Sequence, residues 1–90
     1  MAKSVIFLGP QGTGKSLNAE LLCQRLSLQQ VIELDDLLHT FRADRIGPVG
    51  QLIVTCNEQQ AQTWSVRWGL RVLSVVEARA QLGAAWRTQP

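Results

Sequence analysis

A chain of 90 residues, 46% hydrophobic and 18% charged, is long enough for one small globular domain and too short for several. Its net charge of +2 is mild and its basic residues are scattered, which argues against nucleic acid as a partner. No apolar run approaches the roughly 18 residues of a membrane span, and no secretory leader is seen, so we expect a cytoplasmic protein with no membrane partner.

The first predicted element is a buried strand over residues 4–8, SVIFL, which are apolar and partly β-branched. Residues 9–16, GPQGTGKS, follow directly and hold two glycines separated by four residues, then Lys and Ser. Helical periodicity begins at Ser16 and continues to Leu28. A glycine-rich turn between a strand and a helix is the setting that a phosphate-binding loop requires.

The residue types of this loop suit an anion. Its glycines let the backbone turn several N–H groups inward, and the helix N-terminus adds partial positive charge. Lys15 would reach the β and γ phosphates, and Ser16 offers a hydroxyl to Mg²⁺. The predicted nucleotide-binding residues are Gly9, Gly12, Thr13, Gly14, Lys15 and Ser16. The alternatives are a glycine-rich turn with a solvated lysine, or a loop that binds phosphate without doing chemistry.

The first helix is predicted from about Gly14 to Leu26 or Ser27. Its core-facing stripe is expected to comprise Leu17, Leu21, Leu22, Cys23 and Leu26. Its water-facing residues are expected to be Asn18, Glu20, Gln24 and Arg25. A second strand is predicted over residues 31–34, parallel to the first because crossovers are right-handed.

The second strand ends in Asp35 and Asp36, which are the next candidates for chemistry. Ligands of open α/β sheets bind beyond the carboxyl ends of the strands, where the phosphate loop also lies. Either carboxylate is suited to act as a metal-associated acid or as a general base. The equally weighted alternative is that one of them caps a helical turn over residues 36–41.

The third strand is predicted over residues 51–56 as a continuous apolar run, typical of a central parallel strand. It runs into Asn57 and Glu58 rather than directly into an acid. Thr55 or Asn57 is a candidate to orient a water or the γ-phosphate. Glu58 either replaces the missing acid or belongs to the first turn of the next helix.

The rest of the chain is predicted as a helix over residues 58–68 capped by Asn57 and ended by Gly69, a strand over 70–76, a helix over 77–82 closed by Gly83, and a tail. The three tryptophans, Trp64, Trp68 and Trp86, are expected to be core or interface aromatics, with adenine stacking as the alternative. The two cysteines, Cys23 and Cys56, are expected to be buried free thiols.

Residues 9–16 resemble the phosphate-binding loop of P-loop NTPases, and the wording GPxGTGKS is common among ATPases. Most of the chain also loosely resembles short P-loop proteins of prophage and mobile-element type, through residues 17–22, 54–57 and 71–74. The resemblance implies a single minimal nucleotide-binding domain over residues 1–90. It implies a three-layer α/β fold with a mostly parallel four-stranded sheet in the order 2-3-1-4.

The same resemblance implies binding of ATP with Mg²⁺, since the sequence has no Asn-Lys-x-Asp segment of the kind that reads guanine in GTPases. If the protein is an enzyme, slow ATP hydrolysis or phosphoryl transfer is expected. The catalytic residues would be Lys15, Asp35 and Asp36, and the metal ligands would be Ser16 and Asp35. The alternative function is a phage or mobile-element accessory or inhibitor protein that uses the fold as a scaffold to bind a host protein. A homodimer is a further expected form of partnership.

Overall fold

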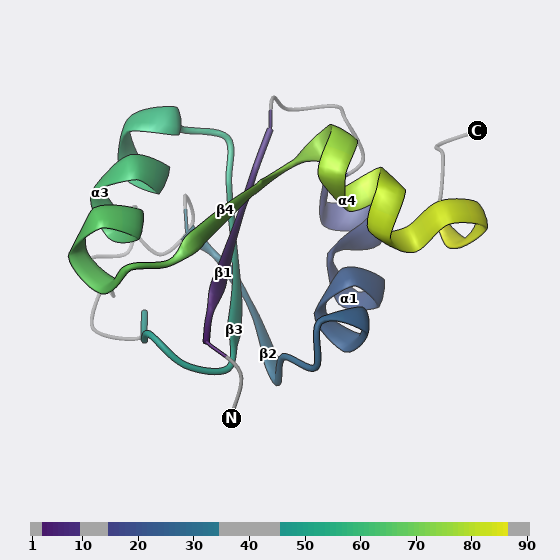
Figure 1. Ribbon diagram of the computed structural model, residues 1–90, viewed down its shortest axis with the longest axis horizontal. Coiled ribbons are helices and arrows are strands. Elements are labelled where there is room, and N and C mark those ends of the chain that lie inside the picture. The colour runs from purple at the N-terminus through teal and green to yellow at the C-terminus, as the bar shows by residue number, and fades with distance from the viewer. Residues whose placement is uncertain (1–2, 10–14, 35–45, 87–90) are drawn as a thin grey trace.

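The fold is built on a parallel β-sheet that runs through the middle of the molecule (Figure 1). The computed structural model describes residues 3–9, 15–34 and 46–86, except for the side chains of residues 15–17. The strands are β1 (Val5–Leu8), β2 (Gln30–Glu33), β3 (Gln51–Thr55) and β4 (Arg71–Ser74). They lie in the order β2-β3-β1-β4, and every neighbouring pair is parallel. The expected fold class and strand order are therefore confirmed.

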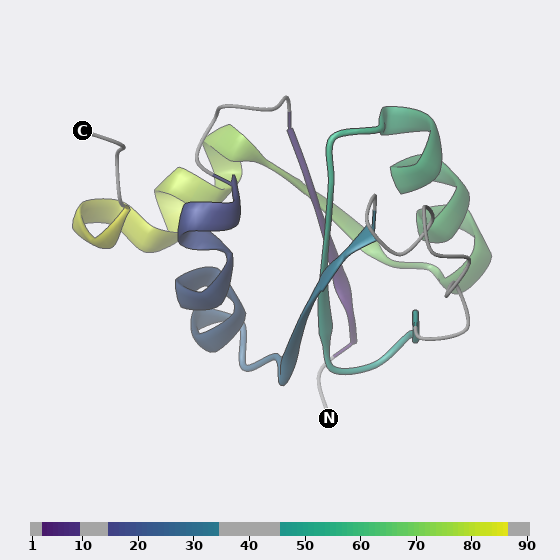
Figure 2. The same ribbon diagram turned by 180° about the vertical axis from the view of Figure 1, so that it is seen from behind.

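Helices cover both faces of this sheet and make the fold three-layered. Helices α1 (Lys15–Arg25) and α4 (Val75–Leu82) lie on one face, and α3 (Glu58–Trp68) lies on the other (Figure 1). The view from behind shows the same arrangement (Figure 2). A short 3-10 turn, η2 (Gly83–Ala85), follows α4, where the sequence predicted an irregular tail.

The core is split between the two faces because side chains alternate along each strand. The layer beneath α1 and α4 contains Phe7, Leu22, Leu52, Val54, Leu73 and Ala78. The layer beneath α3 contains Ile6, Ile32, Leu34, Ile53, Ala61 and Trp64. All of β3 is buried, as expected of a central strand covered on both faces.

Leu22, Cys23 and Leu26 of the predicted stripe pack in the core beneath α1, whereas Leu21 is only half-buried and the side chain of Leu17 lies outside the described part of the chain. Leu22 and Cys23 are buried, and Glu20 is exposed, as expected. Asn18, however, is fully buried rather than facing water. The reason is helical phase: Asn18 lies one turn before Leu22 and therefore shares the face that packs on the sheet. The polarity of the side chain was a poor guide here because the buried face was fixed by its apolar neighbours.

Helix α3 begins and ends where its caps predict. The Asn57 side chain accepts a hydrogen bond from the Gln60 N–H at 3.1 Å, which confirms it as the N-cap. At the other end Gly69 has a φ of 64°, the left-handed conformation that glycine adopts most readily. The bounds Glu58–Trp68 agree with the prediction.

The prediction for the end of β4 was wrong. The strand was expected to continue to Val76, but it ends at Ser74 and α4 begins at Val75. Ser74 and Glu77 form a capping box, in which each side chain accepts a hydrogen bond from the other's backbone N–H. This local capping outweighed the β propensity of the two valines, and Val76 is left 77% exposed.

A buried serine joins the opposite end of the sheet, where β1 and β3 begin. The Ser4 hydroxyl donates to the Gly47 carbonyl at 2.8 Å and accepts from the Gln51 N–H at 3.1 Å. The Ser4 N–H donates to the Pro48 carbonyl at 3.0 Å. In return, the Gln51 side chain accepts from the Gly47 N–H at 2.7 Å. These hydrogen bonds hold the start of β3 against the start of β1.

We predict that Ser4→Ala lowers the free energy of unfolding by about 1–3 kcal/mol, because it leaves a buried donor and a buried acceptor without their partner. Urea denaturation measures the change. The control is Thr63→Ala, which removes an exposed side-chain bond to the Gln59 carbonyl and is expected to cost under about 0.5 kcal/mol. Equal effects of the two substitutions would contradict the role given to Ser4.

Candidate functional site

The sequence GPQGTGKS begins at the carboxyl edge of the sheet, where the central strand β1 ends. Strand β1 ends at Leu8, the buried Gly9 follows, and α1 begins at Lys15. The main chain of Lys15 and Ser16 therefore forms the start of α1, as a strand-to-helix phosphate loop requires. Gly12, Thr13 and Gly14 fall outside the described residues, so their predicted role stays a prediction.

The start of α1 is electrostatically suited to an anion. The first four N–H groups of a helix have no partner within the helix, and the helix dipole adds partial positive charge there. The first turn of α1 contains no acidic residue that would neutralise this charge. By contrast, Glu58 and Glu77 stand in the first turns of α3 and α4. Among these three helices, α1 is the one with no acidic residue in its first turn.

The predicted acids Asp35 and Asp36 lie outside the described residues. Strand β2 ends at Glu33, and its pairing with β3 brings that end to the same edge as the end of β1. Because β3 lies between β2 and β1, the acids follow a strand one position removed from the phosphate loop. Their catalytic and metal-binding roles stay predictions.

The end of β3 is bonded to the first residue of the loop sequence. The Gly9 N–H donates to the Thr55 carbonyl at 3.3 Å, and the Thr55 hydroxyl accepts from the Asn57 N–H at 3.0 Å. Thr55 is buried, whereas Cys56 and Glu58 are exposed. Glu58 is the first residue of α3, so it lies in the first turn of that helix, which was one of the two alternatives predicted for it. The sequence did not reveal the Gly9–Thr55 contact, because only the strand register brings these residues together.

Two clefts border this part of the edge. One of about 610 Å³ is lined by Cys56, Asn57, Glu58, Gln59 and Gln62. The other, of about 290 Å³, extends under α3 and is lined by Leu8, Glu58, Ala61, Gln62, Ser65, Val66 and Val72. They share Glu58 and Gln62, so they meet at the start of α3. Volumes of a few hundred Å³ are typical of small-molecule sites.

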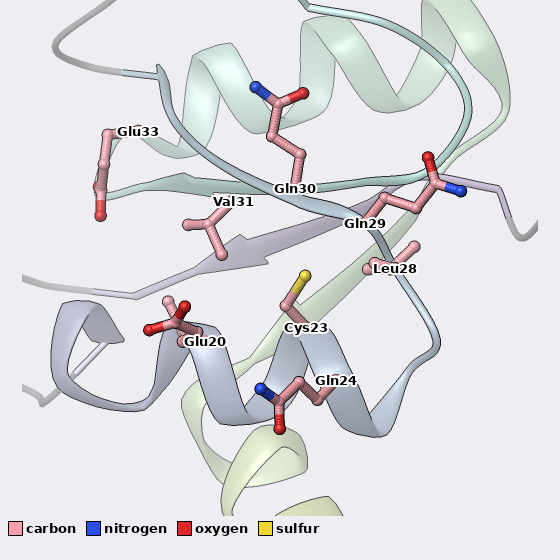
Figure 3. A pocket seen from close by; sticks show the side chains of 9 residues that line it. Glu20, Cys23, Gln24, Leu28, Gln29, Gln30, Val31 and Glu33 are labelled. Carbon is pink, nitrogen blue, oxygen red and sulfur yellow. The ribbon is translucent and has the colours of Figure 1, made fainter.

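A further cleft, of about 520 Å³, lies between α1 and the edge strand β2 (Figure 3). Glu20 and Glu33 stand toward one end of it, Gln29 stands toward the other, and the sulfur of Cys23 points into it. Gly9, the predicted nucleotide-binding residue whose surroundings are fully described, does not line this cleft. Among the described residues, no group of three or more His, Cys, Asp or Glu side chains is arranged to hold a metal ion.

The tryptophans are placed as packing residues. Trp64 is buried, and its ring centroid lies 4.8 Å from that of Trp68. The guanidinium carbon of Arg67 lies 5.3 Å from the centroid of Trp64 and 5.9 Å from that of Trp68. Trp86 is half-buried against the core beneath α1 and α4. Burial and these two contacts make Trp64 a packing residue, as expected.

The two cysteines differ, so the expectation of two buried thiols was half wrong. Neither is in a disulfide; Cys23 is buried and Cys56 is exposed at the carboxyl edge of the sheet. Burial, and secondarily the negative charge of Glu20, raises the pKa of the Cys23 thiol. Cys23 therefore stays protonated at pH values where an ordinary exposed thiol ionises.

No family model matches the chain, and no solved structure gives a significant match. The resemblance to P-loop proteins accordingly rests on residues 9–16 and on their position between β1 and α1. No helix within the described ranges is both long enough and apolar enough to cross a bilayer.

We predict that at pH 8 a disulfide reagent such as DTNB modifies Cys56 rapidly and Cys23 only after unfolding, because the thiolate is the nucleophile and burial disfavours it. One thiol per chain would then react in buffer and both in denaturant. Cys56→Ser is expected to abolish the fast reaction. Burial raises the pKa of Cys23 in the folded state. The free energy of unfolding should therefore fall as the pH rises from the thiol pKa of the unfolded chain through the higher pKa of the folded protein. Two thiols reacting equally fast in buffer would contradict the placement.

Proposed function

We propose that this chain is a P-loop protein that binds ATP together with Mg²⁺. One observation carries the proposal: GPQGTGKS begins where the central strand β1 ends, and its Lys15 and Ser16 open α1. The parallel order β2-β3-β1-β4 supports it, because ligands of such sheets bind beyond the carboxyl ends of the strands. The absence of an acid from the first turn of α1 is further support.

In this proposal the loop amides between Gly9 and Ser16 surround the phosphates, and Lys15 neutralises charge on the β and γ groups. The Ser16 hydroxyl holds Mg²⁺, whose charge screens the phosphate oxygens. Asp35 or Asp36 approaches from the end of β2 as a metal-associated acid or base. The reaction we propose is slow ATP hydrolysis or phosphoryl transfer to an acceptor.

A second candidate is a scaffold that binds a host protein, as an accessory or inhibitor protein of a phage or mobile element would. The observation that favours it is the composition of the β3 end. Thr55, Cys56 and Asn57 follow each other there without an acid, and the Asn57 side chain is used to cap α3. An efficient hydrolase of this type would be expected to hold Mg²⁺ with a carboxylate at this position.

We predict that the protein binds ATP with micromolar affinity in the presence of Mg²⁺ and that Lys15→Ala weakens this binding about 10- to 100-fold. The estimate follows from the loss of one charge-assisted hydrogen bond, worth about 1.5–3 kcal/mol. Calorimetric titration with ATP and ADP measures it.

The matched control is Lys3→Ala, since Lys3 is an exposed lysine at the opposite end of β1, where it forms an isolated bridge with Val49. It should bind ATP like the wild type. Absence of saturable ATP binding by the wild type would overturn the nucleotide proposal and leave the scaffold function. Equal binding by Lys15→Ala would show that ATP occupies some other site.

A further inference from the structure

Thr55 is hydrogen-bonded on two sides, toward the phosphate loop and toward α3. Its carbonyl accepts from the Gly9 N–H at 3.3 Å, and its hydroxyl accepts from the Asn57 N–H at 3.0 Å. The side chain is only 1% exposed. The residue therefore stands between the first residue of the loop sequence and the first turn of a helix on the sheet's other face.

The hydroxyl fixes the turn that follows β3. A Thr side chain that accepts from the N–H two residues later closes a small local turn and limits the conformations of the chain between them. The next bond in the series continues into α3, because the Asn57 side chain accepts from the Gln60 N–H at 3.1 Å. Thr55, Asn57 and the start of α3 are thus held as one unit.

This turn also bears on the Thr55 carbonyl, since that carbonyl belongs to the peptide unit leading into Cys56. Holding Asn57 to the hydroxyl constrains this peptide, and with it the direction in which the carbonyl points. The carbonyl in turn holds Gly9, the glycine with which GPQGTGKS begins. A cradle of backbone amides binds phosphate well only if its conformation is fixed before the ligand arrives.

We propose that Thr55 is a positioning residue for the phosphate loop: its hydroxyl fixes the turn after β3, which aims its carbonyl at Gly9. The inference rests on the proposed nucleotide binding and adds a residue outside the loop sequence to the site. Thr55 touches no phosphate in this account. It acts through Gly9.

The test compares MgATP binding by Thr55→Val and Thr55→Ser. Valine has nearly the shape of threonine but no hydroxyl, so the Asn57 N–H loses its acceptor, whereas serine retains it. We expect Thr55→Val to raise the dissociation constant for MgATP about fivefold to tenfold, because the hydrogen bond that holds the turn before ATP binds is lost. We expect Thr55→Ser to change the dissociation constant less than about twofold. Amide hydrogen exchange at Gly9 should quicken in Thr55→Val and stay slow in Thr55→Ser.

The matched control is Ser4→Ala. It also removes a buried hydroxyl that accepts a bond from a backbone N–H, that of Gln51 at 3.1 Å, but at the end of β1 and β3 opposite the loop. Its melting temperature without nucleotide is expected to fall about as much as that of Thr55→Val, with ATP binding unchanged. If Thr55→Val does not fold, Thr55→Cys replaces it, because cysteine has the same connectivity as serine but its thiol is a much weaker hydrogen-bond acceptor than a hydroxyl.

The outcomes separate the two proposals. A wild type that does not bind MgATP overturns the proposed function. A wild type that binds, with Thr55→Val binding equally well, overturns the positioning role alone. Binding lost equally in Thr55→Ser and Thr55→Val would also overturn it, because the hydroxyl would then not be the group that matters.

Discussion

The pairing of β1 with β3 is the interaction on which the rest of the structure depends. The two strands run parallel in register from Val5 opposite Leu52 to Leu8 opposite Thr55, and both are central in the sheet. Buried hydrogen bonds close this ladder at both ends, through the Ser4 hydroxyl at one and the Thr55 carbonyl at the other. Side chains from these two strands contribute to both core layers. The helices on either face of the sheet therefore pack against residues of this pair.

The pairing of β1 with β3 also determines which residues meet at the carboxyl edge of the sheet. Because β1 is central, its end and Gly9 lie between the ends of β3 and β4, and α1 packs back on one face of the sheet. The first turn of α1 contains no acidic residue.

Much of the fold could be predicted because its signals are local. The apolar run of β3, the Asn57 and Gly69 caps of α3 and the loop motif each specify their own element. Failures occurred where local and nonlocal preferences compete. Asn18 is buried because its helical phase is set by its neighbours, and β4 ends early because the Ser74–Glu77 capping box outweighs two β-branched residues. In the candidate site, the motif could be found in the sequence, but the bond from Gly9 to Thr55 depends on strand register.

The most direct test of the account is a titration of the ¹⁵N-labelled protein with MgATP, followed through backbone amide resonances. Phosphate bound at the carboxyl edge predicts saturable shifts at Gly9, Lys15 and Ser16, with smaller shifts at Cys56 and Asn57 across the Thr55 contact. The amide resonances of residues at the other end of the sheet, such as Ser4 and Gly47, should not shift. An unchanged spectrum, or shifts confined to the cleft between α1 and β2, would contradict the account.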